Sequence, residues 1–142
     1  MGKGGNQEAR VKIRLTAVFG SGLALGLALA GCGSREARVS ATATDYKFAP
    51  DAWTVPAGQE VTLTLANKGG TKHEWVLLKA GEAVTAPFDA DDEDKVFFEV
   101  EAEPGETPTA TFSAPTEAGT YTIVCGAPGH YELGMKGELT VK

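Results

Sequence analysis

Short runs in which apolar and polar residues alternate dominate the sequence after residue 40, with no helical periodicity between them. Val61, Leu63 and Leu65, for example, alternate with threonines. Strict alternation places every second side chain on one face, which is typical of a half-buried β-strand. The expected strands cover residues 46–48, 53–55, 61–65, 74–79, 96–101, 110–113, 121–125 and 137–141.

Glycine- and proline-rich segments separate these runs, for example at residues 56–58, 68–70 and 103–105. Glycine permits positive φ and proline fixes φ, so both favour tight turns. Seven or eight short strands without helices predict an all-β fold, a Greek-key antiparallel β-sandwich. Residues 80–94 are the least patterned part and predict a long excursion with a helical turn.

The first 31 residues have the composition of a targeting segment. Four basic residues precede an uncharged apolar stretch at residues 15–30. Because this stretch is short and interrupted by glycines, it favours the apolar region of a signal peptide over a membrane-spanning helix. An uncleaved membrane anchor is the alternative.

The apolar stretch ends in Leu-Ala-Gly-Cys32, which resembles the lipobox of bacterial lipoproteins. The resemblance implies that residues 1–31 are a lipoprotein signal peptide and that Cys32 carries a diacylglycerol. Residues 32–40 are small and polar and predict a flexible tether, and residues 41–142 predict one folded domain. We therefore expect the protein in the cell envelope, lipid-anchored on the extracytoplasmic side of a bacterial membrane.

The predicted mature chain is acidic. The whole chain has thirteen basic and nineteen acidic residues, and without residues 1–31 it has nine and eighteen, a net charge near −9. Such a surface repels phosphate, which argues against nucleic acid and favours a basic protein as the partner. The acidic run at residues 89–94 either steers that partner or is a solvated loop.

Cys125, His130 and Met135 lie five residues apart, and Cys125 ends the strand expected at residues 121–125. The chain has one further histidine, His73, which opens another expected strand after a pair of glycines. A thiolate and two imidazoles in a trigonal plane, with a weak axial thioether, are the ligands of a blue-copper site. The sequence therefore predicts one type 1 copper per chain, held by these four residues, and single-electron transfer as its function.

Each of these residues also has an ordinary structural role when considered alone. A lone cysteine is often a buried apolar residue, and methionine fills gaps in cores. All the histidine, cysteine and methionine side chains after Cys32, however, lie where a copper site needs them. A disulfide from Cys32 to Cys125 is the other use of the two sulfurs, but the start of a flexible tether is a poor anchor for a core.

Other classes of copper protein need ligand residues that differ from those in this chain. The chain has no His-x-His pair, as a multicopper oxidase would, and no second cysteine near Cys125 for a binuclear copper centre. We therefore expect an electron carrier and not an enzyme. Copper storage or delivery, and a metal-free binding module, remain alternatives.

Residues 40–142 resemble the cupredoxins, the plastocyanin, azurin and auracyanin group of blue-copper proteins. The motifs are Asn67 followed by His73, then Gly-Thr-Tyr-Thr-Ile-Val-Cys125, Pro-Gly-His130 and Gly-Met135-Lys-Gly. Four residues separate Cys125 from His130 and four separate His130 from Met135, a spacing closest to auracyanin.

This resemblance implies eight strands in two sheets, three strong ligands and Met135 as the weak axial ligand. It also implies a redox donor and acceptor, such as a cytochrome or a membrane electron-transport complex, and we expect a monomer. In many cupredoxins the histidine that reaches the surface lies in an apolar patch. Here that residue would be His130, surrounded by uncharged side chains of its loop, unless these are only ordinary loop residues.

One position departs from the group. Many members have asparagine directly after the first histidine, where its amide ties the ligand-bearing segments together, whereas this chain has Glu74. An ionised carboxylate cannot donate a hydrogen bond. The candidates to replace that tie are backbone N–H groups, for example those of Gly126 or Ala127, and a protonated Glu74.

Overall fold

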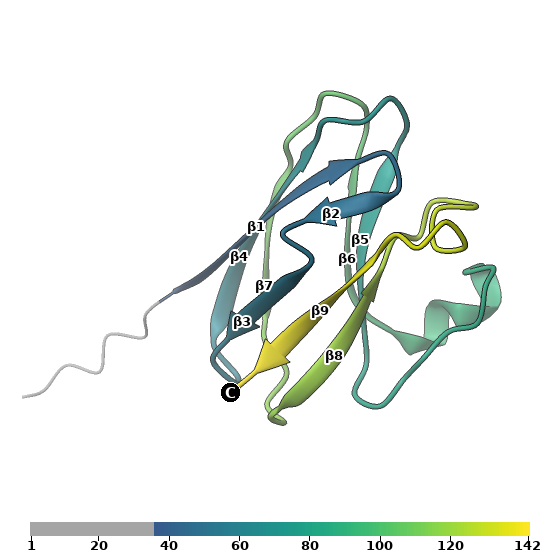
Figure 1. Ribbon diagram of the computed structural model, residues 1–142. Helices are drawn as coiled ribbons and strands as arrows, with labels where there is room; N and C mark the ends of the chain where they lie inside the picture. Colours follow the sequence, from purple (N-terminus) through teal and green to yellow (C-terminus); the bar gives the residue numbers. More distant parts are fainter. Residues whose placement is uncertain (1–35) are drawn as a thin grey trace, which may run out of the picture. The chain divides into compact units, whose positions relative to one another are not determined.

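The computed structural model describes residues 36–142, which form two β-sheets (Figure 1). One sheet has the strand order β2-β1-β4-β7 and the other β3-β9-β8-β5-β6. The strands are β1 (Ala37–Thr44), β2 (Lys47–Ala49), β3 (Ala52–Val55), β4 (Glu60–Asn67), β5 (His73–Leu78), β6 (Val96–Ala102), β7 (Thr109–Ser113), β8 (Gly119–Val124) and β9 (Lys136–Val141), and η1 (Ala90–Lys95) is a short 3₁₀ helix. The predicted all-β sandwich is confirmed.

The predicted signal peptide and Cys32 lie outside the described residues. Within residues 36–142, no helix has both the length and the apolar character to cross a membrane. The first strand, β1, begins at Ala37 and so includes part of the segment that we expected to be a tether. The reason is that Val39, Ala41 and Ala43 alternate and are buried, although small alanines make the alternation weak as a sequence signal.

The sheets are mixed and contain nine strands, whereas the sequence predicted a purely antiparallel arrangement of seven or eight. β1 pairs parallel to β4, and β3 pairs parallel to β9. The chain places β2 in one sheet, β3 in the other and β4 back in the first. Parallel neighbours require such crossover connections. Alternation in the sequence identifies a strand but does not reveal which strand it pairs with.

The core lies between the two sheets and consists of the inward side chains of every strand. Trp75 on β5 is fully buried, and its ring contacts the rings of Trp53 and Phe112 at centroid distances of 5.8 and 6.3 Å. Cys125 and Met135 belong to the same buried cluster. The site residues are therefore anchored in the packed core rather than on a mobile surface loop.

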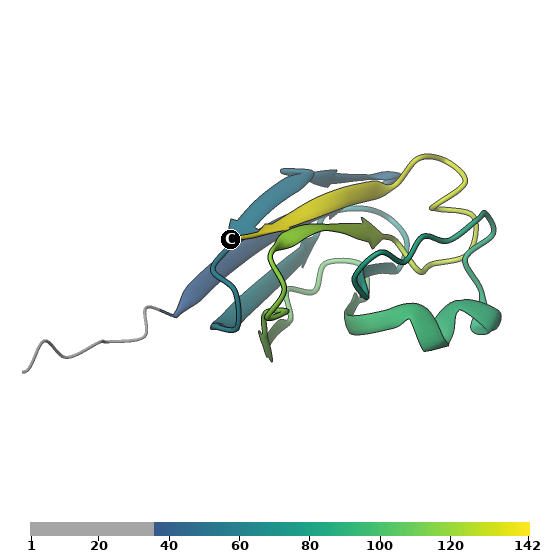
Figure 2. The same cartoon turned by 90° about the horizontal axis from the view of Figure 1, so that it is seen from below.

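The expected excursion connects β5 to β6 and contains η1, which confirms the predicted helical turn. Asp89 caps η1 by accepting a hydrogen bond from the Asp91 N–H. Buried Val84 packs against Val76 and Val124 and so attaches the excursion to the five-stranded sheet. In two perpendicular views the excursion lies at the same end of the sandwich as the loop after β8 (Figures 1 and 2).

Candidate metal centre

The loop between β8 and β9 carries Cys125, His130 and Met135, and backbone hydrogen bonds connect these three residues. The Cys125 N–H donates to the Met135 carbonyl, and the Met135 N–H donates to the His130 carbonyl, both at 3.0 Å. Gly129 and Gly134, with φ of 82° and 90°, directly precede His130 and Met135. Only glycine adopts such φ values readily, so the two glycines allow the tight turns that orient the following side chains.

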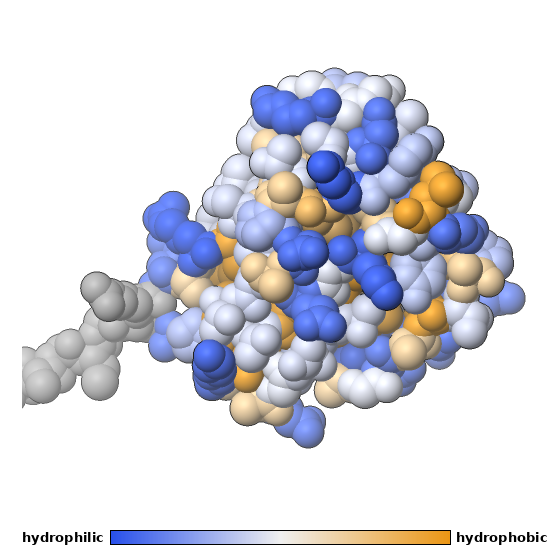
Figure 3. All heavy atoms as spheres, viewed as in Figure 1, coloured by the Kyte–Doolittle hydropathy of each residue, from blue (hydrophilic) through white to orange (hydrophobic). Residues whose placement is uncertain are grey.

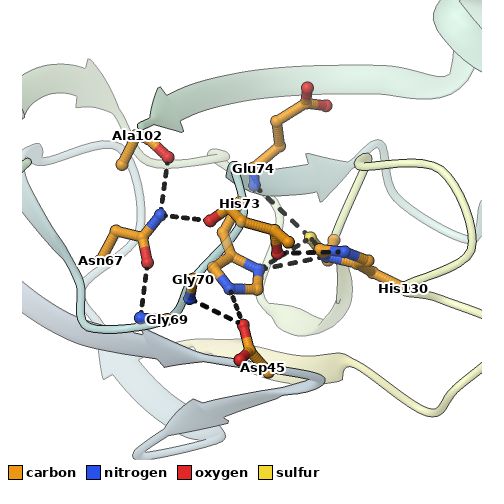
Figure 4. A network of polar contacts seen from close by, with 10 residues as sticks. Asp45, Asn67, Gly69, Gly70, His73, Glu74, Ala102 and His130 are labelled. Atoms are coloured by element: carbon orange, nitrogen blue, oxygen red, sulfur yellow. Dashed lines mark hydrogen bonds and ion pairs between the residues drawn. The ribbon is translucent and has the colours of Figure 1, made fainter. Parts of the chain in front are cut away.

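A buried amide positions His73 at the start of β5. The Asn67 side chain donates to the carbonyls of Thr71 and Ala102, at 2.7 and 2.9 Å, and accepts from the Gly69 N–H at 2.8 Å (Figure 4). Asn67 is fully buried and all three contacts are to backbone groups. The turn after β4 is thereby fixed, and it delivers His73 to the end of the sheet next to the loop after β8.

The side chains of His73, Cys125 and His130 converge. The two Nδ1 atoms are 3.1 Å apart, and Cys125 Sγ lies 3.9 Å from Nδ1 of His73 and 3.4 Å from Nδ1 of His130. His73 and Cys125 are fully buried, and His130 is 7% exposed. A divalent ion with bonds of about 2.0–2.3 Å to nitrogen and sulfur fits between these atoms. The soft thiolate with two imidazoles matches copper.

Burial determines the protonation of two of these ligands in the metal-free protein. It raises the pKa of the Cys125 thiol, against the opposing effect of the backbone N–H groups of Glu74 and Ala127. Burial also lowers the pKa of His73, and the neighbouring His130 lowers it further. The thiol is thus protonated and the imidazole of His73 neutral at pH 7, so metal binding must release the thiol proton.

Glu74 ties the two ligand segments through its backbone instead of an amide side chain. Its N–H points at Cys125 Sγ, 3.4 Å away. Its carboxylate binds Lys72 Nζ at 2.7 Å and packs over Gly126, where a Cβ atom would collide with it. The N–H of Ala127, which the sequence suggested as a donor, acts to lower the pKa of the Cys125 thiol and so favours the thiolate. A protonated Glu74 is therefore not needed for the tie.

The turn between β1 and β2 contributes two site residues that sequence reasoning missed. Asp45 Oδ1 lies 3.5 Å from Nε2 of His73, and the Tyr46 ring meets the His130 ring edge to face at a centroid distance of 5.3 Å. Asp45 and Tyr46 form a two-residue hairpin turn between β1 and β2. The sequence placed Tyr46 in the strand expected at residues 46–48, and only the weak alternation of small residues at 39–43 indicates the strand before the turn.

The pKa of His73 leads to a prediction for the metal-free protein. Because the folded state holds this pKa below the ordinary 6.5, the unfolded chain binds more protons between the two values. The free energy of unfolding therefore falls as the pH drops from neutrality through about 6.5. Urea midpoints at about pH 7.5 and 5.5 measure this loss. His73→Gln should lose most of the difference, and a full pH dependence in that variant would contradict the assignment.

The fold and the ligand cluster together define a blue-copper protein with one type 1 copper site. The chain belongs to the family of copper binding proteins described as the plastocyanin/azurin family, which it matches over residues 35–142.

Several relatives support this assignment. Auracyanin-A of Chloroflexus aurantiacus is 33% identical over 126 residues, which cover 78% of this chain and 76% of that protein. The copper-resistant cuproprotein CopI of Rubrivivax gelatinosus is 30% identical over 102 residues, covering 68% of this chain and 60% of CopI. The crystal structure of dithionite-reduced auracyanin from Roseiflexus castenholzii has a TM-score of 0.66 at 29% identity, covering 75% of this chain and 98% of that one.

Proposed function

We propose that the protein is an electron carrier that exchanges single electrons between redox proteins and is held at the membrane by lipid on Cys32. The observation that supports this role is the buried His73–Cys125–His130 cluster, whose ligand atoms lie within 3.9 Å of one another. Bound copper supplies the Cu(I)/Cu(II) couple. The sandwich keeps the ligands in place, and a site that moves little on reduction favours fast electron exchange.

We assign the axial position to Met135. Its side chain is fully buried, and its backbone bonds to Cys125 and His130, the two strong ligands on the same loop. A thioether in this position is the weak, long contact of a blue-copper site and is one of the factors that set the reduction potential.

Electrons would leave through the edge of His130. The Tyr46 ring, 45% exposed, packs against the His130 ring, and Pro128 and Leu133 (60% exposed) are exposed on the loop that carries His130. On the face shown in Figure 3, hydrophobic residues form small separate groups among hydrophilic ones. Two other uncharged residues of this loop are turned to other uses: Ala127 is buried, and the Tyr131 hydroxyl donates to a carbonyl of the excursion. Exposed apolar groups around a redox ligand suit transient docking of a partner.

A basic redox protein, such as a cytochrome, is the partner that the charge distribution favours. A groove of about 690 Å³ lies between the excursion and the copper loop. Its lining includes the carboxylates of Glu74, Asp89, Glu93, Glu99, Glu101 and Glu132. Acidic groups beside the apolar patch would attract a positively charged partner and orient it toward His130.

Stopped-flow electron exchange between the copper-loaded protein and a basic cytochrome tests this role. The rate should fall as ionic strength rises, because salt screens the attraction. Leu133→Ala should slow exchange about fivefold, as for a docking residue worth about 1 kcal/mol. Phe97→Ala, which removes an exposed apolar side chain of β6, is the matched control. A wild-type protein that is not reversibly reduced would contradict the carrier role.

The similarity to CopI favours one alternative, the binding of copper for storage or delivery. Delivery requires ligands that an acceptor can reach, whereas the three ligands here are 0–7% exposed. Incubation of the copper-loaded protein with a copper chelator distinguishes the two functions. Rapid metal loss would favour delivery, and retention together with fast electron exchange would favour the carrier.

A further inference from the structure

The second ring nitrogen of His73 faces away from the ligand cluster, toward the turn between β1 and β2 (Figure 4). This atom, Nε2, is fully buried and has no hydrogen-bond partner of normal geometry in residues 36–142. The carboxylate of Asp45 lies 3.5 Å from it, at the outer limit of a hydrogen bond. A buried ring nitrogen thus has a carboxylate as its neighbour.

The surrounding backbone is shaped for this approach. A Cβ atom on Gly69 would lie 2.5 Å from Asp45 Oδ1 and 2.6 Å from His73 Nε2, closer than real Cβ contacts. Gly69 has no positive φ, so its role here is steric: it leaves room for the two side chains to meet. The Gly70 N–H donates to the same Asp45 oxygen at 3.1 Å and orients the carboxylate.

We propose that Asp45 is a positioning residue for the copper site, whose carboxylate keeps the proton of His73 on Nε2 and leaves the Nδ1 lone pair directed at the metal. Histidine ligands commonly donate their second N–H to a carboxylate, which fixes the tautomer and makes the ligand more basic. This inference rests on the copper site and assigns to Asp45 a role within it.

A carboxylate near the metal also favours Cu(II) over Cu(I), since the more highly charged ion gains more from a negative neighbour. The Asp45 side chain is 52% exposed, so water screens part of this effect. The expected sign is a reduction potential that is lower with Asp45 than without it.

Asp45→Asn removes the negative charge but keeps the hydrogen bond of the turn, because asparagine retains an oxygen that can accept from the Gly70 N–H. In the metal-free variant, ¹⁵N NMR of the imidazoles should show a smaller fraction of His73 with its proton on Nε2. Cu(II) affinity should fall about 10- to 100-fold. Each tenfold loss of Cu(II) relative to Cu(I) binding raises the potential by about 59 mV. Gly69→Ala, which separates Asp45 from His73 sterically, should shift the tautomer and the potential in the same directions.

Glu117→Gln is the control, because it removes an equal charge at the opposite end of β8 from Cys125. The proposal is overturned if Asp45→Asn matches both the wild type and this control in tautomer, Cu(II) affinity and potential. The NMR measurement uses metal-free protein and does not depend on electron exchange. A protein that fails as a carrier can therefore still confirm or refute the role of Asp45.

Discussion

Cys125→Ser is expected to lose the intense blue colour of the copper-loaded protein entirely. The colour of such sites arises from the bond between Cu(II) and a thiolate, and a serine hydroxyl is neither soft nor ionised at pH 7. The substitution changes the volume of the buried side chain little, so the metal-free protein should still fold. Visible absorption after titration with Cu(II), together with circular dichroism of the metal-free protein, measures both effects.

Cys32→Ser is the matched control, since it removes the other cysteine of the chain. This variant should be as blue as the wild type. If Cys32 carries lipid, the same variant should move from the membrane fraction to the soluble fraction on expression in bacteria. Persistence of the blue colour in Cys125→Ser would refute the proposed ligand set, and loss of colour in Cys32→Ser would show that the second sulfur takes part.

Trp75→Ala is expected to have the largest effect on stability, a loss of about 3–5 kcal/mol in the free energy of unfolding. The indole is fully buried between Trp53 and Phe112, so alanine leaves a cavity bounded by rigid rings. Because Trp75 lies two residues after His73 on β5, we also expect weaker copper binding. Urea unfolding of the metal-free protein and a copper titration measure the two effects.

Trp75→Phe should be far milder than Trp75→Ala. Phenylalanine keeps an aromatic ring in the core and removes an indole N–H that has no hydrogen-bond partner in the described part of the chain. Its loss of stability should therefore be well below that of the alanine variant. Equal destabilisation by the two substitutions would mean that ring packing is not what Trp75 contributes.

The sequence alone predicted the sandwich and the converging ligands because both depend on local patterns. Alternation identifies strands one at a time, and Cys125, His130 and the proposed ligand Met135 lie within eleven residues of one loop. His73 could be added because it is the single other histidine in the chain. The chemistry of the ligands required no knowledge of which strands pair.

Features that depend on pairing between distant segments could not be predicted. The parallel partner of β1 is β4, and only that pairing places the turn after β1 beside the ligands. Asp45 therefore approaches His73 although 28 positions separate them in the sequence. The contact from the Glu74 N–H to Cys125 Sγ could not be assigned to Glu74 from the sequence either, because every residue except proline has a backbone N–H.

The loop after β8 closes on itself through the hydrogen bonds between Cys125, His130 and Met135. Its internal geometry is consequently set by eleven consecutive residues, while the sandwich contributes the flanking strands and one imidazole. We therefore expect insertions or replacements between Cys125 and Met135 that keep these two core residues to alter the reduction potential while the sandwich keeps its own sequence requirements.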